Sequence, residues 1–298
     1  MVEPSTVQKT SRFWLFFPFI VVLLIIAAWT AYWVIAKGQV EQRVDAWIAA
    51  ERARGSDVEY TSKSVSGYPF RFEIDVRDPV YKPVGGPRWE GERLRLVLQP
   101  WNLNHIIAYA PGRNLITEPG GLRHTVNLDK TSAASMSWDE TSIRRIGLQL
   151  GSASALINGE TYAATGFSLN LSPRPEAPED LMIAVQWDRL TLNTPPEGAE
   201  YLGDTLGPSR LVGEFRNFFQ AWIRAGGDAS RLHEAMRDVE GEIEVAQFIL
   251  DWGPLDLGAK GDLSFEGGKA NGSFGMRLEN AEGLLAEMEA ANRLGNEE

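Results

Sequence analysis

An uncharged apolar segment near the amino terminus limits what this chain can fold into more than any other feature. The segment Phe13 to Ala36, FWLFFPFIVVLLIIAAWTAYWVIA, contains no charged residue. As a helix it would span roughly 36 Å, which exceeds the ~30 Å hydrocarbon layer of a bilayer. Pro18 lies close to the helix start, where a transmembrane helix tolerates it. The sequence therefore predicts a transmembrane helix over 13–36, preceded by a short tail over 1–12.

The segment is too long for the apolar region of a cleaved signal peptide, so we interpret it as an anchor. Its orientation is less plain, because Lys9 and Arg12 precede the span while Lys37, Arg43 and further cations follow it. A bare count places the second flank in the cytoplasm, but long domains cross a membrane largely regardless of charge. We expect the tail over 1–12 inside and the bulk of the chain outside.

Apolar residues recur at helical spacing after the span, at Val44, Trp47 and Ile48, and Gly55 offers a helix stop. This pattern predicts that the helix continues over 37–55. Two interpretations stay open. The segment is either a stalk that lifts the following domain off the bilayer or an amphipathic helix that lies flat on the membrane surface.

The apolar period then changes from 3.6 to 2, which indicates β-strands. The clearest case is GYPFRFEIDVR, where Phe70, Phe72, Ile74 and Val76 form the expected apolar sheet face and charged residues alternate with them. The stretches ERLRLVLQP, LRHTVNLD and LMIAVQWD repeat the alternation between Pro- and Gly-rich turns. We expect a mainly β fold with a few helices, built on an antiparallel curved sheet with one buried and one solvated face.

An aromatic stripe predicts a helix that covers part of the apolar sheet face. Its main residues are Phe215, Phe218, Phe219 and Trp222. We interpret the stripe as core, because a bare patch of that size would promote aggregation; the alternative is a docking surface for a partner. A second short helix capped by Asp228 would follow.

The expected domain covers 56–298 and has three parts. The main sheet occupies 56–195, a helical insert 209–240, and the final strands with a carboxyl-terminal helix 241–298. That last helix is expected from Asn280 to about Leu294.

Composition argues against several classes of function. The chain has 29 Lys and Arg against 40 Asp and Glu, a net charge of −11, and no basic stripe, so we expect no nucleic-acid partner. It has no cysteine, which removes disulfides, thiolate metal sites and thiol catalysis. The three histidines lack metal-ligand spacing, and no nucleophile elbow, P-loop or dinucleotide motif occurs. We expect no catalytic residue, no metal and no cofactor; a hydrolase is the least favoured alternative.

A polar-aromatic cluster occurs in PWNLNHIIAY, where Trp101, His105 and Tyr109 are candidates for one shared turn. We interpret it as a capped turn that packs onto the sheet rather than as a binding site. Paired carboxylates such as Asp139 with Glu140 also occur, but exposed positions explain them more simply than glycosidase chemistry does.

Three stretches together resemble the alphaproteobacterial family catalogued as domain of unknown function 2125. They are GYPFRFEIDV, QPWNLNHIIAYAPG and a tail that contains DWGPLDLGAKGDLSFEGGKANGSFGMRLENAEGLL. The resemblance implies an inner-membrane anchor with a periplasmic β-rich domain, and it brings no established activity. The tail also looks like the last strands of AsmA-type envelope proteins, whose long curved sheets offer an apolar surface to lipid acyl chains; this is a fold-level analogy.

Together these observations predict a non-enzymatic, single-pass protein of the bacterial inner membrane with a cytoplasmic amino terminus and a periplasmic bulk. Its partners would be the membrane bilayer and lipid of the cell envelope, which the apolar sheet face contacts or handles. The alternative is an envelope scaffold or assembly factor that binds another protein through its acidic surface or the helices near 228–240.

Overall fold

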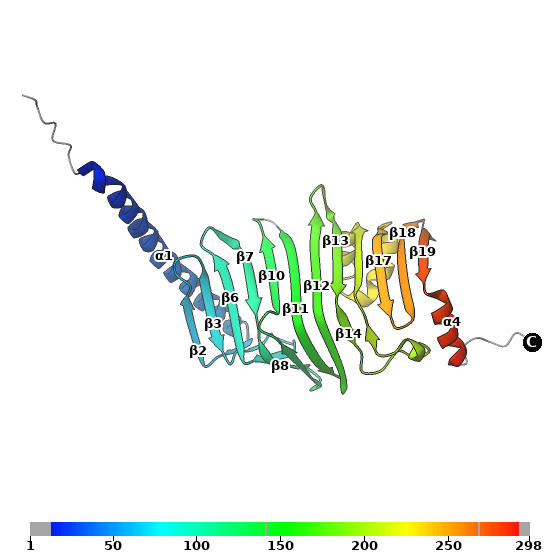
Figure 1. The fold of residues 1–298 in the computed structure, drawn as a ribbon. Helices are drawn as coiled ribbons and strands as arrows, with labels where there is room; N and C mark the ends of the chain where they lie inside the picture. The colour runs from blue at the N-terminus through cyan, green and yellow to red at the C-terminus, as the bar shows by residue number, and fades with distance from the viewer. Residues whose placement is uncertain (1–12, 141, 268, 292–298) are drawn as a thin grey trace, which may run out of the picture.

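The computed structural model describes residues 13–140, 142–267 and 269–291 and shows a long helix attached to one end of an extended sheet (Figure 1). The described strands form one 19-stranded antiparallel sheet. The prediction of a mainly β, antiparallel fold with a few helices is confirmed. The predicted tail over 1–12 lies outside the described residues.

The helix α1 (Phe13–Ala53) contains both the predicted span and the predicted stalk. Its most apolar stretch has a mean hydropathy of 2.5 and is only 11% buried, so the helix is long and apolar enough to cross a membrane. It ends where Gly55 adopts φ +91°, a left-handed conformation that favours glycine. The carboxyl-terminal part of α1 continues straight and lies against the sheet (Figure 1).

The amino-terminal half of the sheet divides into two arms. The first arm is, in spatial order, β2 (Ser62–Ser66), β3 (Phe72–Arg77), β6 (Arg93–Gln99), β7 (Asn102–Tyr109) and β10 (Ala133–Trp138). The second arm is β1 (Asp57–Glu59), β4 (Val80–Lys82), β5 (Arg88–Gly91), β8 (Gly112–Thr117) and β9 (Arg123–Leu128).

The long strand β11 (Ile143–Ile157) joins the two arms, because its first half pairs with β10 and its second half with β9. At the other end of the arms, α1 contacts β1 and β2, the outermost strand of each. Helix and arms therefore enclose a space between them.

Beyond β11 the sheet continues to the carboxyl-terminal end of the molecule. Its strands are β12 (Glu160–Arg174), β13 (Ala177–Trp187), β14 (Arg189–Thr191), β15 (Thr205–Leu206), β16 (Ser209–Arg216), β17 (Glu242–Trp252), β18 (Leu255–Glu266) and β19 (Lys269–Glu279). The short helices are η1 (Glu200–Leu202), α2 (Phe218–Arg224), η2 (Ala229–Arg231), α3 (Leu232–Asp238) and α4 (Ala281–Ala290).

Two differences from the predicted helices follow from the local pattern. The expected insert over 209–240 begins with a strand, because Leu211 and Phe215 fit a period of 2 as well as a helical stripe, and their neighbours β13 and β17 pair with this segment. The carboxyl-terminal helix ends at Ala290 and buries none of its residues. The predicted end near Leu294 lies outside the described residues.

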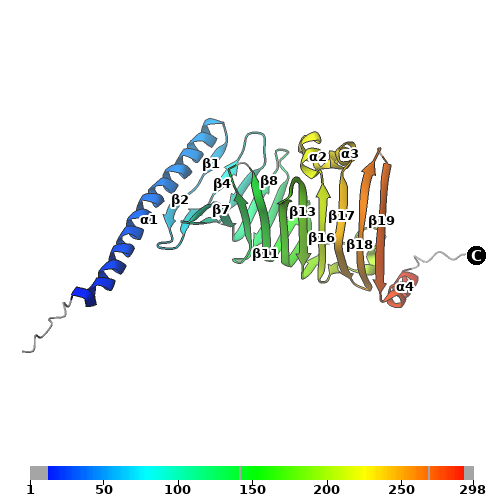
Figure 2. The same ribbon diagram turned by 90° about the horizontal axis from the view of Figure 1, so that it is seen from above.

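A small core lies where α2 and α3 pack on the sheet. Its buried members are Ala221, Ala225, Ala235, Met236 and Phe265. Figure 2 shows these two helices on the same side of the sheet as the end of α1. One face of the sheet is therefore covered by protein at two separate places.

Candidate functional site

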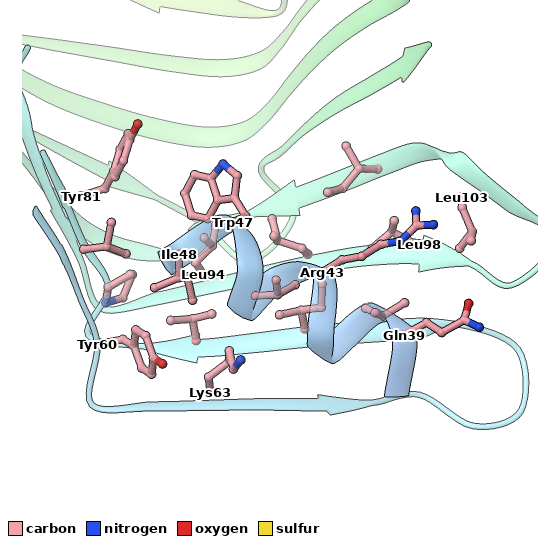
Figure 3. Close-up of a pocket in the computed structure, with 18 of the residues that line it drawn as sticks. Gln39, Arg43, Trp47, Ile48, Tyr60, Lys63, Tyr81, Leu94, Leu98 and Leu103 are labelled. Atoms are coloured by element: carbon pink, nitrogen blue, oxygen red, sulfur yellow. The ribbon is translucent and has the colours of Figure 1, made fainter. Parts of the chain in front are cut away.

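An apolar groove of about 850 Å³ lies between α1 and the two arms of the sheet (Figure 3). On the helix its lining extends from Tyr32 to Ile48, roughly 24 Å at ~1.5 Å per residue. The volume lies within the range of small-molecule sites, which is ~300–1,000 Å³. The groove thus begins within the apolar segment of α1 and follows the helix into the domain.

The sheet lines the groove mainly with apolar side chains from both arms. The first arm contributes Ile74, Val76, Leu94, Leu96, Leu98, Leu103, Ile106 and Trp138, and the second contributes Val58, Val80, Tyr81 and Trp89. In β3 and β6 the lining residues are every second one, because side chains alternate between the two faces of a strand.

Few polar side chains line the groove. Lys63 forms an ion pair with Asp45 of α1. Arg43 forms no ion pair within the described part of the chain, and it extends with Gln39 toward the end marked by Leu98 and Leu103 (Figure 3). The charged residues of the lining are thus Arg43, Lys63 and Glu59, and Asp45 neutralises Lys63.

A hydrogen-bond network holds the carboxyl-terminal end of α1 against the second arm. The buried Glu51 carboxylate accepts from Ser56 Oγ at 2.9 Å, from Arg54 Nη1 at 2.6 Å and from Tyr81 Oη at 3.2 Å. The bond from Ser56 is the main reason that the pKa of Glu51 lies below its ordinary value of 4.5. Burial, and then the bond to Glu51, raises the pKa of Tyr81, which lines the groove.

Three hydrogen bonds attach the other end of the groove to the apolar part of α1. Trp29 Nε1 donates to Pro69 O at 3.0 Å, Tyr32 Oη donates to Pro100 O at 3.0 Å, and Trp33 Nε1 donates to Arg71 O at 3.2 Å. The accepting carbonyls belong to the β2–β3 and β6–β7 turns. The domain is thus fastened to α1 before the helix reaches its first following charge.

The strand register places two unbroken rows of apolar residues or glycine on the groove side of the sheet. The first row is Phe72, Leu98, Ile106, Met136, Ile146, Leu171, Ile183, Gly213, Val245, Gly261 and Phe274. The second is Val65, Ile74, Leu96, Ala108, Ala134, Leu148, Leu169, Val185, Leu211, Phe248, Ala259 and Met276.

Directly paired residues share one face of a sheet, so each row is a continuous surface feature. The second row crosses the molecule from β2 to β19, roughly 50 Å at ~4.8 Å per strand. The opposite face is mixed: one of its rows contains Glu73, Ser135 and Asn170. Within the described strands, the continuous apolar rows therefore lie on the groove side of the sheet.

The predicted apolar sheet face is present except at its first residue. Phe72 and Ile74 are 0% and 3% exposed, and Val76 lines the groove. Phe70 is 69% exposed and lies in a turn closed by a bond from Arg71 N to Gly67 O. The prediction was wrong for Phe70, because the turn that contains Pro69 delays the start of β3.

The predicted helical stripe comes from two elements rather than one. Phe215 lies on β16, while Phe218, Phe219 and Trp222 lie on α2. Their rings still form one cluster, with centroid distances from Phe218 of 5.9 Å to Phe215, 5.4 Å to Phe219 and 6.1 Å to Trp222. The cluster packs beside the small core under α2 and α3.

The predicted polar-aromatic turn does not exist as one unit. His105 and Tyr109 lie within β7, which pairs with β6 and β10 on either side. The ring of Tyr109 lies 4.5 Å below the Arg95 guanidinium. Trp101 alone lies in a turn, where it is 62% exposed.

The described residues contain no group of His, Asp and Glu that would hold a metal ion. His124 lies 2.9 Å from Glu118, and His233 contacts the carbonyl of Ser230. The contribution of α1 to the groove was not foreseen from the sequence. Its signal was the helical spacing of Val44, Trp47 and Ile48, which equally fits a stalk.

Comparison with known proteins gives one positive finding. A search of curated proteins returns no match, and neither does a search of solved structures. A family model described as "Uncharacterized protein conserved in bacteria (DUF2125)" matches residues 33–298. That range includes both arms, all of the remaining sheet and every groove residue except Tyr32, and the chain accordingly belongs to the DUF2125 family.

Proposed function

We propose that this chain is a non-enzymatic protein of the bacterial inner membrane that takes up lipid acyl chains in the groove between α1 and the sheet. In this proposal α1 is a single-pass anchor, the residues before it are cytoplasmic, and the β-rich domain is periplasmic. Support comes from the length and apolar character of α1 and from membership of a bacterial family.

One observation carries the proposal: the groove begins inside the apolar segment of the anchor. Tyr32 and Ile35 line it and precede Lys37, the first charge after the span. A lipid chain would therefore move from the bilayer into the groove along apolar side chains, with Gln39 and Arg43 beside its path. Each methylene that stays in apolar surroundings on this path avoids the cost of exposure to water, which is about 0.8 kcal/mol.

The chemistry of the lining favours an apolar occupant over water. A buried water needs two to four polar partners, and the lining offers mainly aliphatic and aromatic side chains. The two apolar rows extend this surface from the groove toward β19. A long curved sheet with such a face is also what the looser likeness to AsmA-type proteins implies, and lipid handling is proposed partly on that analogy.

The proposal is tested by lipid retention in the purified full-length chain. Leu98 of β6 lines the groove, and its neighbour Val97 points to the opposite face. We expect native mass spectrometry of the wild type and of Val97→Trp to detect bound phospholipid, and Leu98→Trp to lose most of it. Thermal melts of both variants control for overpacking, which costs ~1–3 kcal/mol.

Two results would overturn the proposal. One is a lipid-free wild type after extraction in mild detergent. The other is equal lipid retention in Leu98→Trp and Val97→Trp. The orientation has its own test, because an alkaline phosphatase fused to the carboxyl terminus is active only in the periplasm.

A second candidate function, an envelope scaffold, is favoured by strand β19. All its residues are exposed, and among the described strands it pairs only with β18. Phe274, Met276 and Leu278 are 50%, 73% and 44% exposed, so the edge offers both backbone groups and apolar side chains to a partner strand. Crosslinking from position 276 in native membranes would capture a stoichiometric protein in this case. The helix α3 is a weaker candidate, since Ala235 and Met236 are buried.

A further inference from the structure

We propose that two turns beside α1 insert into the membrane interface and fix the sheet against the bilayer. We call them the aromatic turns: residues 67–71 between β2 and β3, and residues 100–101 between β6 and β7. Three aromatic residues in them are exposed to solvent: Tyr68 is 49% exposed, Phe70 69% and Trp101 62%. Both turns lie at the edge of the sheet from which α1 emerges (Figure 1).

Hydrogen bonds place the aromatic turns beside the last turns of the apolar segment. In addition to the bonds from Trp29, Tyr32 and Trp33, the Tyr68 hydroxyl lies 2.7 Å from Thr30 Oγ1. Thr30 precedes Lys37 by roughly 10 Å along the helix at ~1.5 Å per residue. If α1 spans a bilayer, the turns therefore lie at the depth of its interfacial layer.

That depth and the residue types agree with each other. Interfacial elements bury their apolar side chains ~5–10 Å into the headgroup and acyl boundary. Trp and Tyr are enriched at this level in membrane proteins, because a ring with one polar group suits an environment that is partly wet. Trp29 and Tyr32 of α1, whose rings lie 5.5 Å apart, belong to the same belt.

The charge pattern changes with distance from α1. The aromatic turns contain no acidic residue, although the chain as a whole has 40. The next turn on that edge, between β10 and β11, carries Asp139, which pairs with Arg144. At the opposite edge Asp78 and Glu92 are joined by a backbone hydrogen bond. Among these four places, the two turns fastened to α1 are the ones without an acidic residue, which suits contact with a bilayer.

The inference rests on the anchoring role of α1 in the proposed function, and it does not depend on lipid uptake by the groove. The chain has no cysteine, so single nitroxide labels can be placed without a background. We would label Phe70→Cys and Trp101→Cys in full-length protein in phosphatidylcholine vesicles. The measurement is the accessibility of each label to oxygen, which concentrates in lipid, relative to a water-soluble nickel chelate.

Two control positions give the ratios expected in water and in the hydrocarbon layer. Val84→Cys replaces a side chain that is also 69% exposed but lies near Gly55, beyond the end of α1. Leu24→Cys reports the hydrocarbon layer, since Leu24 is 65% exposed within the span. We expect the oxygen-to-nickel ratio at positions 70 and 101 to be several-fold higher than at 84 and below that at 24.

The outcomes separate this inference from the proposed function. Ratios at 70 and 101 equal to that at 84, with a lipid signal at 24, would overturn membrane insertion of the turns and leave the anchor intact. A water-like signal at 24 would overturn both. Labels at 70 and 101 in lipid would support the inference even if the groove retained no phospholipid.

Discussion

Replacing Phe72 by Ala would test whether the helix and the sheet form one folded unit. Phe72 is the first residue of β3 and is completely buried, and its ring stacks on Trp33 of α1 at 5.6 Å and 25°. Removing a buried Phe ring costs ~3–5 kcal/mol. For a domain of this size each kcal/mol lowers Tm by ~2–4 °C, so we expect a decrease of roughly 10 °C.

The matched control lies two positions earlier in the same alternating stretch. Phe70→Ala removes the same ring from a side chain that is 69% exposed, and we expect it to change the free energy of unfolding by less than ~0.5 kcal/mol in detergent micelles. Thermal melts followed by circular dichroism measure both variants. If Phe72→Ala lowered Tm no more than Phe70→Ala, the burial argument and the docking of α1 on the sheet would both be wrong.

Three further changes have defined outcomes. Because the pKa of Glu51 is lowered in the folded chain, its contribution to stability is complete above the ordinary value of 4.5 and is lost as pH falls through the folded pKa. Glu51→Gln should therefore reduce the decrease of Tm in this acid range. The same dependence of Tm on pH in the variant and the wild type would contradict this role of Glu51. Asp228→Ala removes the acceptor of Ser230 N at the start of η2 and should cost about 1 kcal/mol, whereas Asp228→Asn should cost less in the same melts. Gly67→Ala, at φ +106°, would bring a Cβ within 2.6 Å of Arg71 O and should lower the free energy of unfolding by more than ~1 kcal/mol. An unchanged Tm would show that the β2–β3 turn does not have this conformation.

Local periodicity was enough to predict the β architecture. The alternation in Phe72, Ile74 and Val76 depends only on which side of a strand faces water, and a short window contains that information. Boundaries were less certain where two patterns overlap. Leu211 and Phe215 fit a helix and a strand equally well, and the pairing of β16 with β13 and β17 decides between them.

The groove could not be predicted from the same signals, because it depends on contacts between segments far apart in the chain. Trp33 and Phe72 touch only when α1 lies across both arms, and no local pattern specifies that crossing. The predictions for Trp101, as part of one turn with His105 and Tyr109, and for Phe70, as part of the apolar sheet face, were wrong for a related reason. Each is an exposed aromatic in a turn, and its position acquires meaning only from the hydrogen bonds that place the turn beside α1.

Helices cover the apolar face of the sheet at some places and leave it exposed at others. This difference helps to distinguish the two proposed functions. α1 covers the rows at one end, and α2 with α3 covers part of the second half, whereas Met136 and Ile146 between them are 37% and 38% exposed. Monomeric soluble proteins rarely leave a long apolar surface bare. Because the rows are continuous, a lipid chain that entered beside α1 would meet the same chemistry as far as Met276. A block at Leu98 should therefore reduce lipid retention and leave contacts at β19 intact, while a charge at Met276 should weaken a protein partner and leave lipid in the groove.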